Sequence, residues 1–510
     1  MHISPTREEF RGSAEHHRLV PVFTRVLADA ETPLSLYRKL AAGRSGAFLF
    51  ESASQGQWDR YSFIGRDPVA TLTEQDGELL WLGTAPAGAP TSGDVLTGLH
   101  ETMRLLSIER PHAGLPPMIS SFVGYLGWDF VRRTERLGPG PEPVDAVPEL
   151  SLSVPGDVAI YDHYTSEVTL VANVVNVNGL DSGVDDAYDA GCQRLEAMLT
   201  ELAAPLASDV AWYDRAEPQV SSRTDRDDYL QMIERAKGNI VDGDVFQVVL
   251  SQRFEAECTA DPLDVYRLLR TFNPSPYMYL LDVPTPDGTP MTIVGSSPEA
   301  LVTVTDGKVE THPIAGSRPR GATAEEDRQL AAELLADEKE RAEHLMLVDL
   351  ARNDLSKVCR PGSVDVVNFM EIERYSHIMH IGSTVVGTCD DDVDGIDVLS
   401  AVFPAGTLSG APKPRALQLI DDYETVARGV YGGAVGYLSF TGDLNVAIAI
   451  RTGVIRNERI SVSAGAGVVA DSVPATEDQE SRNKAAAVLR AAAAAQTLTR
   501  PNGSAAEVRS

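Results

Sequence analysis

The chain has 510 residues, of which 43% are hydrophobic and 23% charged, so it is long enough for two globular domains. Its net charge of −30 argues against a nucleic-acid partner, because binding to phosphates requires a basic surface. No apolar run is long enough to span a bilayer, no signal-peptide core is present, and the four cysteines form no CxxC pair. We therefore expect a cytoplasmic protein with no membrane partner.

The N-terminal part, residues 1–203, combines many strands with few helices. A helix with a capping threonine and an early proline is predicted over residues 32–40, and a second helix over 184–203. Alternating or apolar stretches predict strands at residues 46–52, 60–65, 158–161 and 167–172. This pattern favours an α+β architecture over repeated βαβ units.

Residues 204–223 lack periodicity and are predicted to connect this part to a second domain, residues 224–498. Thr224 is predicted to cap a helix, because an acidic residue stands three positions later. The remaining predicted elements are strands at 245–250, 277–281 and 293–299 and helices at 323–348 and 484–496. The last residues, 499–510, are predicted to form a disordered tail.

Near the C-terminus, a strand of small residues, 463–470, leads through a loop into a helix that carries Glu477, Glu480 and Lys484 on one face. Glu340 and Glu343 have the same i, i+3 spacing on another predicted helix. Hard carboxylate oxygens suit Mg²⁺, which usually takes one or two carboxylates plus waters and substrate oxygens. Each pair is also typical of a solvated helix face, so the spacing alone leaves both interpretations open.

From about residue 224 to residue 490, the chain resembles the chorismate-utilising enzymes, and specifically the anthranilate synthase component I family. The resemblance rests on a series of motifs that occur in the family's order. The motifs are Gly295-Ser-Ser-Pro-Glu299, His312-Pro-Ile-Ala-Gly-Ser-Arg318, the segment 340–354, Arg374-Tyr-Ser-His-Ile-Met-His380, Phe403-Pro-Ala-Gly-Thr-Leu-Ser-Gly-Ala-Pro-Lys413, Tyr431-Gly-Gly-Ala-Val-Gly-Tyr437 and Ala447-Ile-Ala-Ile-Arg-Thr452. The N-terminal part matches more loosely, through residues 49–52 and 60–65. The resemblance implies a two-domain α+β fold of orthogonal antiparallel β-sheets with outer helices.

The resemblance also implies how chorismate and Mg²⁺ bind. Glu343 and Glu480 would hold the metal on the ring carboxylate, with Glu340 and Glu477 nearby. Tyr431 and Arg451 would bind the enolpyruvyl carboxylate, since a guanidinium can donate two parallel hydrogen bonds. The remaining implied substrate residues are Gly316, Ser317, Thr407, Gly465, Ala466, Gly467 and Lys484.

Two residues match the family's catalytic positions. Ammonia would add at C2 of chorismate while Glu299 protonates the departing C4 hydroxyl, and His380 would then remove the C2 proton as pyruvate leaves. On the residues alone, Glu299 could be a turn carboxylate and His380 a strand histidine without a catalytic role. His344 and His377 are interpreted as structural.

Other positions separate the chain from relatives that use a different nucleophile or product. Gln247 stands where isochorismate and salicylate synthases have a water-activating lysine, and Ala315 where aminodeoxychorismate synthases have lysine. Both therefore favour anthranilate as the product. Two departures from the family pattern are Ser317 in place of threonine and Ala447 in place of a cysteine near the substrate arginine.

The resemblance further implies feedback inhibition by L-tryptophan and a partner subunit. The tryptophan-binding positions are Glu51, Ser52, Asn273, Pro274, Pro276, Tyr277 and Met278; the alternative is that the Pro-Ser-Pro segment only shapes a loop. No glutamine-hydrolysing segment is visible, so ammonia would come from a separate glutamine amidotransferase subunit. The resemblance implies that the two kinds of subunit form a heterotetramer. The competing hypotheses are an enzyme that stops at aminodeoxyisochorismate and a non-catalytic tryptophan sensor.

Overall fold

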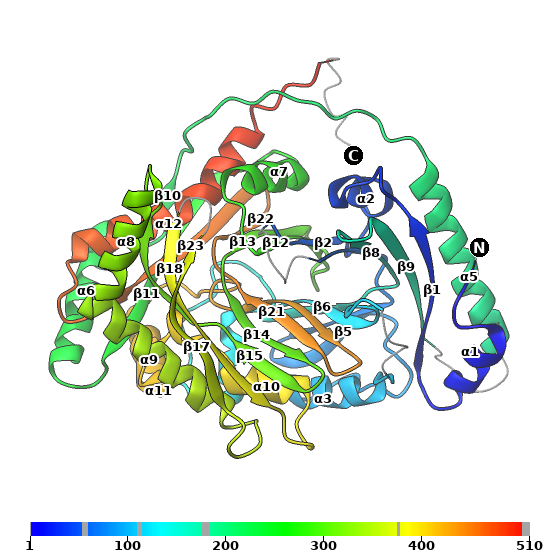
Figure 1. The fold of residues 1–510 in the computed structure, drawn as a ribbon, viewed down its shortest axis with the longest axis horizontal. Helices are drawn as coiled ribbons and strands as arrows, with labels where there is room; N and C mark the ends of the chain where they lie inside the picture. The colour runs from blue at the N-terminus through cyan, green and yellow to red at the C-terminus, as the bar shows by residue number, and fades with distance from the viewer. Residues whose placement is uncertain (1, 54–59, 110–114, 176–182, 375–377, 502–510) are drawn as a thin grey trace.

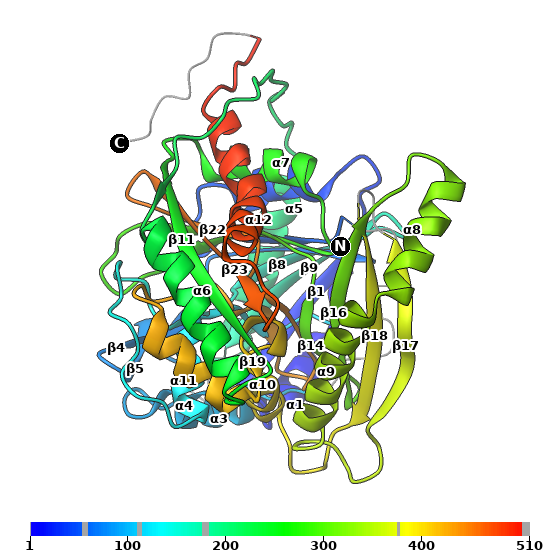
Figure 2. The same cartoon turned by 90° about the vertical axis from the view of Figure 1, so that its left-hand side faces the viewer.

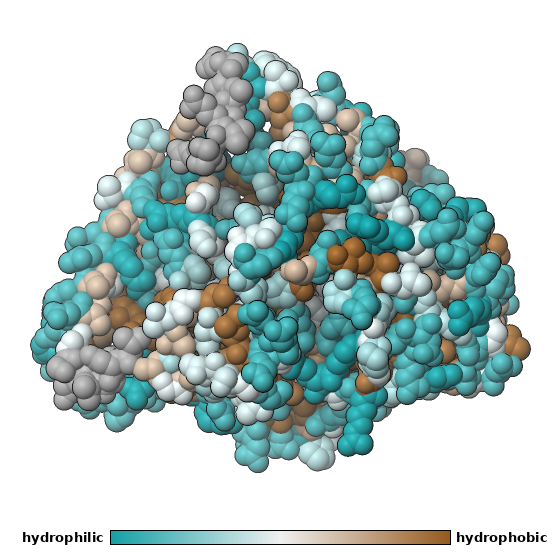
Figure 3. All heavy atoms as spheres, turned by 180° about the vertical axis from the view of Figure 1, so that it is seen from behind, coloured by the Kyte–Doolittle hydropathy of each residue, from teal (hydrophilic) through white to brown (hydrophobic). Residues whose placement is uncertain are grey.

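The computed structural model describes residues 2–53, 60–109, 115–175, 183–374 and 378–501. It contains two large antiparallel sheets with helices around the outside (Figure 1). The predicted α+β class is confirmed, because the sheets are antiparallel throughout their described pairings and the helices lie outside them. Seen from behind, hydrophilic residues cover most of the surface, with apolar groups scattered among them (Figure 3).

The first sheet, sheet A, follows the order β1-β9-β8-β3-β2-β12-β13-β22-β23-β11-β10, and β19 pairs with β11. Its strands are β1 (Leu19–Leu27), β9 (Glu167–Val175), β8 (Asp157–Asp162), β3 (Tyr61–Arg66), β2 (Phe48–Glu51), β12 (Tyr277–Val283), β13 (Met291–Ser297), β22 (Thr452–Arg456), β23 (Arg459–Val468), β11 (Gln247–Glu257), β10 (Ser221–Ser222) and β19 (Gly410–Ala411).

The second sheet, sheet B, follows the order β16-β18-β15-β14-β21-β20-β6-β7-β4-β5, and β17 pairs with β18. Its strands are β16 (Ile314–Pro319), β18 (Ile378–Thr388), β15 (Lys308–Thr311), β14 (Ala300–Thr305), β21 (Leu444–Ile448), β20 (Ala434–Ser439), β6 (Ser121–Leu126), β7 (Leu150–Val154), β4 (Ala70–Gln75), β5 (Glu78–Gly83) and β17 (Asp365–Arg374).

Among the described residues the helices number twelve, with two short 3₁₀ turns. They are α1 (Arg7–Ala14), α2 (Pro33–Leu40), α3 (Val95–Leu105), α4 (Val131–Thr134), α5 (Val184–Ala203), α6 (Arg226–Val241), α7 (Pro262–Phe272), α8 (Ala324–Ala336), α9 (Glu338–Leu355), α10 (Gly395–Val402), α11 (Lys413–Tyr423) and α12 (Pro474–Ala495), with the turns η1 (Trp128–Phe130) and η2 (Gly406–Leu408).

Both sheets join strands from the two halves of the chain. In sheet A, β2 of the N-terminal half pairs with β12, and in sheet B β6 pairs with β20. Between the sheets lies an apolar layer that includes Phe63, Tyr279, Ile293 and Tyr437. The connection from α5 arches over the molecule toward β10 (Figure 1). The division into residues 1–203 and 224–498 stays a prediction, but each sheet is continuous across it.

Two predicted helix boundaries are wrong. The cap of α6 is Asp225 rather than Thr224, because the Asp225 carboxylate accepts the backbone N–H of Asp227. The helix predicted over 323–348 is two helices, α8 and α9, because Asp337 adopts an extended conformation between them and caps the start of α9.

The start of the predicted disordered tail is anchored to the body of the protein. Thr499 forms a β-bridge with Trp212, and the Arg500 guanidinium pairs with Asp209 and Asp264. Residues 502–510 lie outside the described residues, as does His377.

Candidate active site

The strand of small residues and the helix after it form one wall of the site. β23 pairs with β11, and α12 packs against β23 between α6 and α7 (Figure 2). A Cβ on Gly467 would lie only 2.3 Å from the Gln247 amide nitrogen, so a larger residue would force that amide to move. The Lys484 ammonium donates to the Gly465 carbonyl at 3.0 Å and pairs with Glu480 at 2.7 Å. Lys484 therefore fixes the glycine strand to the helix that carries the carboxylates.

The opposite wall is built from α9 and the edge strand β16. Gly316 has φ +65 and interrupts the pairing of β16 with β18, and a Cβ there would lie 2.9 Å from a Glu340 carboxylate oxygen. Glu343 accepts a hydrogen bond from Gln247 at 3.1 Å, and Glu340 lies 3.5 Å from the Arg318 guanidinium. The two glutamates predicted on one helix face thus point toward β11 and β16. Ser317 has an exposed surface beside them.

The four glutamates predicted for the metal accumulate negative charge. Burial raises the pKa of Glu343, and the charges of Glu340 and Glu480 add to the rise. Burial likewise raises the pKa of Glu477, with a further contribution from Glu480. A divalent cation would relieve this repulsion, and the donors are the hard oxygens that Mg²⁺ prefers. The residues present therefore fit the ion.

These oxygens do not converge as tightly as a closed metal cage. Among the described residues, no three of the four glutamates bring ligand atoms within 4.8 Å of one another, whereas His100, Asp394 and Asp397 do. The latter cluster has a structural explanation, because Asp394 and Asp397 form the capping box of α10. An open set of carboxylates agrees better with an ion that keeps waters and substrate oxygens in its coordination sphere.

Glu299 follows β13 and lies in a protein-enclosed position. Burial raises its carboxyl pKa to about 8, although the Thr407 hydroxyl, at 3.3 Å, and the charges of His312 and Lys484 oppose the rise. A carboxylic acid with this pKa keeps its proton near neutral pH and can donate it. The structure therefore brings Thr407 and Lys484 to the predicted acid.

His380, on β18, has the tautomer of a base. Its Nδ1 lies 2.9 Å from the Gly316 carbonyl, which can only accept, so Nδ1 carries the proton and Nε2 presents a lone pair. Burial lowers the His380 pKa, and the nearby Arg451 cation lowers it further. The imidazole is therefore neutral around pH 7.

Arg451 has an unusual backbone conformation and an unsatisfied cation. Its φ is +51, a region that costs free energy for a side chain other than glycine and is often kept for function. Burial lowers the guanidinium pKa, while Tyr431 and Glu480 counteract this. In the described part of the chain, its guanidinium forms no hydrogen bond or ion pair. Tyr431, itself near the Gly465 backbone, lies beside it, and Ala466 is buried in the same strand.

A second pocket lies between the two sheets where the halves of the chain meet. Glu51 stands opposite Met278 in the pairing of β2 with β12, at the end of one strand and the start of the other. Its cavity, about 70 Å³, is lined by Glu51, Ser52, Pro276, Tyr277 and Met278 together with aromatic residues of both sheets. We call it the aromatic pocket. Asn273 lies just behind it, bonded to Ser296, and Pro274 does not line the cavity.

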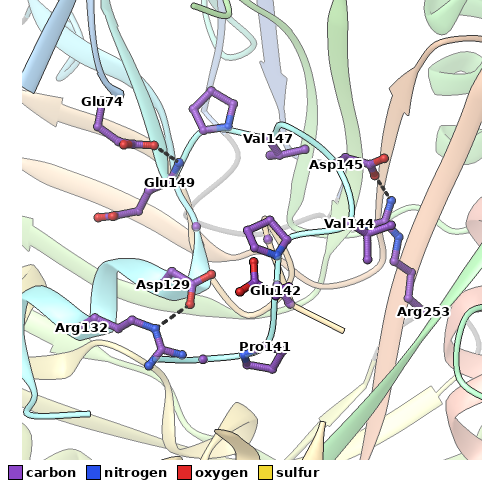
Figure 4. Close-up of a pocket in the computed structure, with 16 residues that line it drawn as sticks. Glu74, Asp129, Arg132, Pro141, Glu142, Val144, Asp145, Val147, Glu149 and Arg253 are labelled. Atoms are coloured by element: carbon purple, nitrogen blue, oxygen red, sulfur yellow. Dashed lines mark hydrogen bonds and ion pairs between the residues drawn. The ribbon is translucent and has the colours of Figure 1, made fainter. Parts of the chain in front are cut away.

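A larger hollow, about 300 Å³, lies elsewhere and contains none of the predicted site residues among its lining (Figure 4). Its arginines already have carboxylate partners. Arg132 lies 2.9 Å from Asp129 and 2.7 Å from Asp421, and Arg253 pairs with Asp145. A still larger hollow, about 580 Å³ beside α7 and α12, also contains none of the predicted site residues, so cavity size does not mark the predicted site.

Sequence reasoning passed over two residues that the structure places beside the site. His312 belongs to a motif used for the resemblance, but its partner Glu373 is 61 positions away and no local pattern joins them. Ser296 bonds Asn273 through its side chain, and its backbone N–H donates to the Arg451 carbonyl at 3.1 Å. His344, interpreted as structural, is buried and bonded to Ser383.

The chorismate binding enzyme family matches residues 45–490, and the chain belongs to this family. Similar proteins carry the name anthranilate synthase component 1: that of Mycolicibacterium smegmatis is 55% identical over 97% of this chain and 95% of its own, and that of Arthrobacter globiformis is 54% identical over 97% and 94%. The crystal structure of anthranilate synthase component I from Streptococcus pneumoniae is 35% identical, with a TM-score of 0.75 over 91% of this chain and 99% of that one. The predicted family and fold are confirmed.

The fold alone is shared more widely. The menaquinone-specific isochorismate synthase of Escherichia coli superposes with a TM-score of 0.70 over 95% of this chain and 98% of its own, at 18% identity. Among the described residues, no helix is both long and apolar enough to cross a membrane.

Proposed function

We propose that the chain converts chorismate and ammonia to anthranilate and pyruvate as the large component of an anthranilate synthase. The observation that carries the proposal is a protonated acid, a neutral base and a guanidinium that pairs with no acid among the described residues, all in one region. Glu299, His380 and Arg451 supply these three groups. The 55% identity to a protein named anthranilate synthase component 1 supports the same activity.

The first step would join ammonia to C2 of chorismate and break the C4–O bond. Glu299 donates its proton to the leaving hydroxyl, which departs as water. Gln247, which occupies the nucleophile side of the site and bonds Glu343, has no basic nitrogen to activate water. This favours ammonia over water as nucleophile, and so an amino product.

The second step would remove the C2 proton and expel pyruvate. Nε2 of His380 accepts the proton, while Nδ1 stays bonded to Gly316 and holds the ring in place. Arg451 and Tyr431 hold the enolpyruvyl carboxylate, so the leaving group remains oriented. Stopping after the first step would give aminodeoxyisochorismate instead.

We further propose that Mg²⁺ binds between α9 and α12, held by Glu343 and Glu480, with Glu340 and Glu477 close by. When bound, the ion would neutralise the ring carboxylate and withdraw electron density from the ring. The raised pKa values of Glu343 and Glu477 support this placement, because the carboxylates carry more negative charge than their surroundings stabilise.

The partners are part of the same proposal. A glutamine amidotransferase subunit would supply ammonia within a heterotetramer, and L-tryptophan would inhibit by binding the aromatic pocket. Glu51, buried against Tyr266 and Arg270, offers a carboxylate for the ligand's ammonium group. The four free cysteines suit a reducing cytoplasm.

The test is an assay of the purified chain with chorismate, Mg²⁺ and ammonium, following anthranilate fluorescence. We expect anthranilate formation that stops with a chelator and falls with tryptophan. Accumulation of an amino-chorismate would identify an enzyme that ends at aminodeoxyisochorismate, and no consumption of chorismate would favour a sensor. Glutamine in place of ammonium should give no product, since the amidotransferase is a different chain.

A further inference from the structure

A small cavity joins the proposed acid to a histidine that the proposed chemistry does not use. Its volume is about 50 Å³, which is room for water, and Glu299, Thr407 and His312 all contribute to its lining. The other walls come largely from apolar side chains of α9 and the segment before η2. Glu299 and His312 therefore line one small, partly open cavity, Glu299 from the segment between β13 and β14 and His312 from the segment between β15 and β16.

His312 is held in an acidic environment. Its Nε2 lies 2.6 Å from a Glu373 carboxylate oxygen on β17, and its Nδ1 lies 3.1 Å from the Thr384 hydroxyl on β18. The side chains of His312 and Glu373 are each 27% exposed, so solvent reaches the pair. The pair thus extends from the surface to the cavity.

The charges around His312 favour its protonated form. Burial lowers its pKa, but the hydrogen bond and charge of Glu373, with the charges of Glu310 and Glu299, outweigh burial and raise the pKa above the ordinary value. Two further titratable groups lie near it among the described residues. The pKa of His344 on α9 is lowered to about 4 by burial, so it is neutral near pH 7, and Asp354, which lines the same cavity, is paired with Lys357 and Lys413.

We propose that His312 is a relay that returns a proton to Glu299 after each turnover, through water in the shared cavity. The inference rests on the proposed function, in which Glu299 loses one proton to the departing C4 hydroxyl. In the return step Nε2 of His312 stays bonded to Glu373, the hydrogen bond from Nδ1 to Thr384 opens and the Nδ1–H bond breaks. A cavity water takes this proton and releases another, an O–H bond forms on the Glu299 carboxylate, and no electron is transferred. Solvent then reprotonates His312 beside Glu373, which keeps the ring charged.

The relay makes the first turnover different from the later ones. Glu299 already carries its proton before the first turnover, so His312 is needed only afterward. In His312→Gln, at pH 7 with ammonium, we expect the single-turnover rate with enzyme in excess to match that of the unaltered chain. The steady-state rate should fall by about ten-fold or more, since a positioned proton donor typically contributes at least that much.

Two further variants make the test decisive. His312→Ala leaves room for a small donor, so added imidazole should restore its steady-state rate in a saturable way. His100→Gln is the matched control, because His100 also bonds a carboxylate, Asp394 at 2.8 Å, and is 23% exposed, but it lies on α3 and does not line the cavity. His100→Gln should have the same single-turnover and steady-state rates as the unaltered chain.

Slowing of the first turnover in His312→Gln to the same extent as the steady state would overturn the relay and leave a structural role for His312. Unchanged rates in both regimes would overturn it as well, as would an absence of imidazole rescue in His312→Ala. Failure of the unaltered chain to make anthranilate would instead count against the proposed function itself.

Discussion

The aromatic pocket and the candidate active site both draw on strands of sheets A and B but are built differently. The pocket is formed by neighbouring strands in register, with Glu51 opposite Met278, and by rings such as Phe63 and Tyr437, whose centroids are 5.8 Å apart. The active site gathers ionised groups from strand ends and from two helices, α9 and α12. The first depends on packing, whereas the second stores charge that a substrate and a cation would neutralise.

Because of this difference, the two sites should be sensitive to different substitutions. A pocket fixed by strand pairing can select a ligand by shape and one buried charge without changing when it is empty. A site made of like charges and a partly buried guanidinium has a high electrostatic cost that only its ligands offset. Changes that remove charge should therefore separate the two sites.

The largest expected effect is at the acid. Glu299→Gln removes the donated proton and keeps the shape, so anthranilate formation should fall by about 10²–10⁴-fold, while tryptophan binding, measured by calorimetry, stays unchanged. Because the pKa of Glu299 is raised to about 8, the protonated form predominates below that pH and is lost as pH rises through it. At constant free ammonia, the rate of the unaltered chain should therefore decline above pH 8.

The pH profile of Glu299→Gln tests whether Glu299 causes the decline. Its residual rate should lack the decline above pH 8, because glutamine does not titrate. A similar decline in the variant would show that another group causes it. The matched control is Asp282→Asn, because Asp282 is also a carboxyl group whose pKa burial raises, to about 6, and it does not line the cavity that Glu299 and His312 share. Loss of tryptophan binding in Glu299→Gln would contradict the separation of the sites.

The intermediate effect is in the aromatic pocket. Glu51→Gln keeps a carbonyl oxygen that can accept from Tyr266 but removes the charge proposed to bind the ligand's ammonium group. The tryptophan concentration for half-inhibition should rise by about 10–100-fold, as expected for losing a charge-assisted hydrogen bond, with kcat unchanged.

Asp282→Asn is the control for this change, since Asp282 lies on the same strand, β12, with a pKa that burial raises to about 6, but does not line the pocket. This variant should have the same tryptophan concentration for half-inhibition as the unaltered chain. Equal inhibition of Glu51→Gln and the unaltered chain would remove Glu51 from the binding of tryptophan.

Local motifs in the sequence are enough to predict site residues, whose roles stay predictions. Glu299, His380 and Arg451 stand in short ordered motifs, and helix periodicity alone placed Glu340 with Glu343 and Glu477 with Glu480. The fold class followed from the strand pattern and the resemblance. The α8–α9 break was missed because a single aspartate, Asp337, in an extended conformation ends one helix and begins the next.

What the sequence could not provide is contact between distant strands. The pair of His312 with Glu373 depends on how β15, β17 and β18 align in sheet B. The contact of Ser296 with both Asn273 and Arg451 depends on the register of β13 with β12 and β22. Side-chain directions in a sheet are fixed by such register, and a shift by one residue would reverse them.

The smallest expected effect is on the connection between the two sites. Ser296 bonds the Asn273 side chain at 3.1 Å and its N–H bonds the Arg451 carbonyl at 3.1 Å, so it joins the proposed effector segment to the substrate arginine. Ser296→Ala removes the hydrogen bonds of the hydroxyl to Asn273 and Ser275, each worth about 1 kcal/mol, and keeps the backbone bond to Arg451. The ratio of chorismate KM with and without saturating tryptophan should therefore shrink by about five-fold, because coupling between sites is a difference in binding free energy.

Ser62→Ala is the control for that variant, because Ser62 is also a buried strand serine of sheet A whose hydroxyl bonds a side chain, His163 at 2.8 Å, far along the sheet from Arg451. It should leave the KM ratio unchanged. If Ser296→Ala instead weakened tryptophan binding and left the ratio intact, Ser296 would belong to the aromatic pocket alone. If it lowered kcat without tryptophan, it would belong to the active site, and the two regions would communicate by another route.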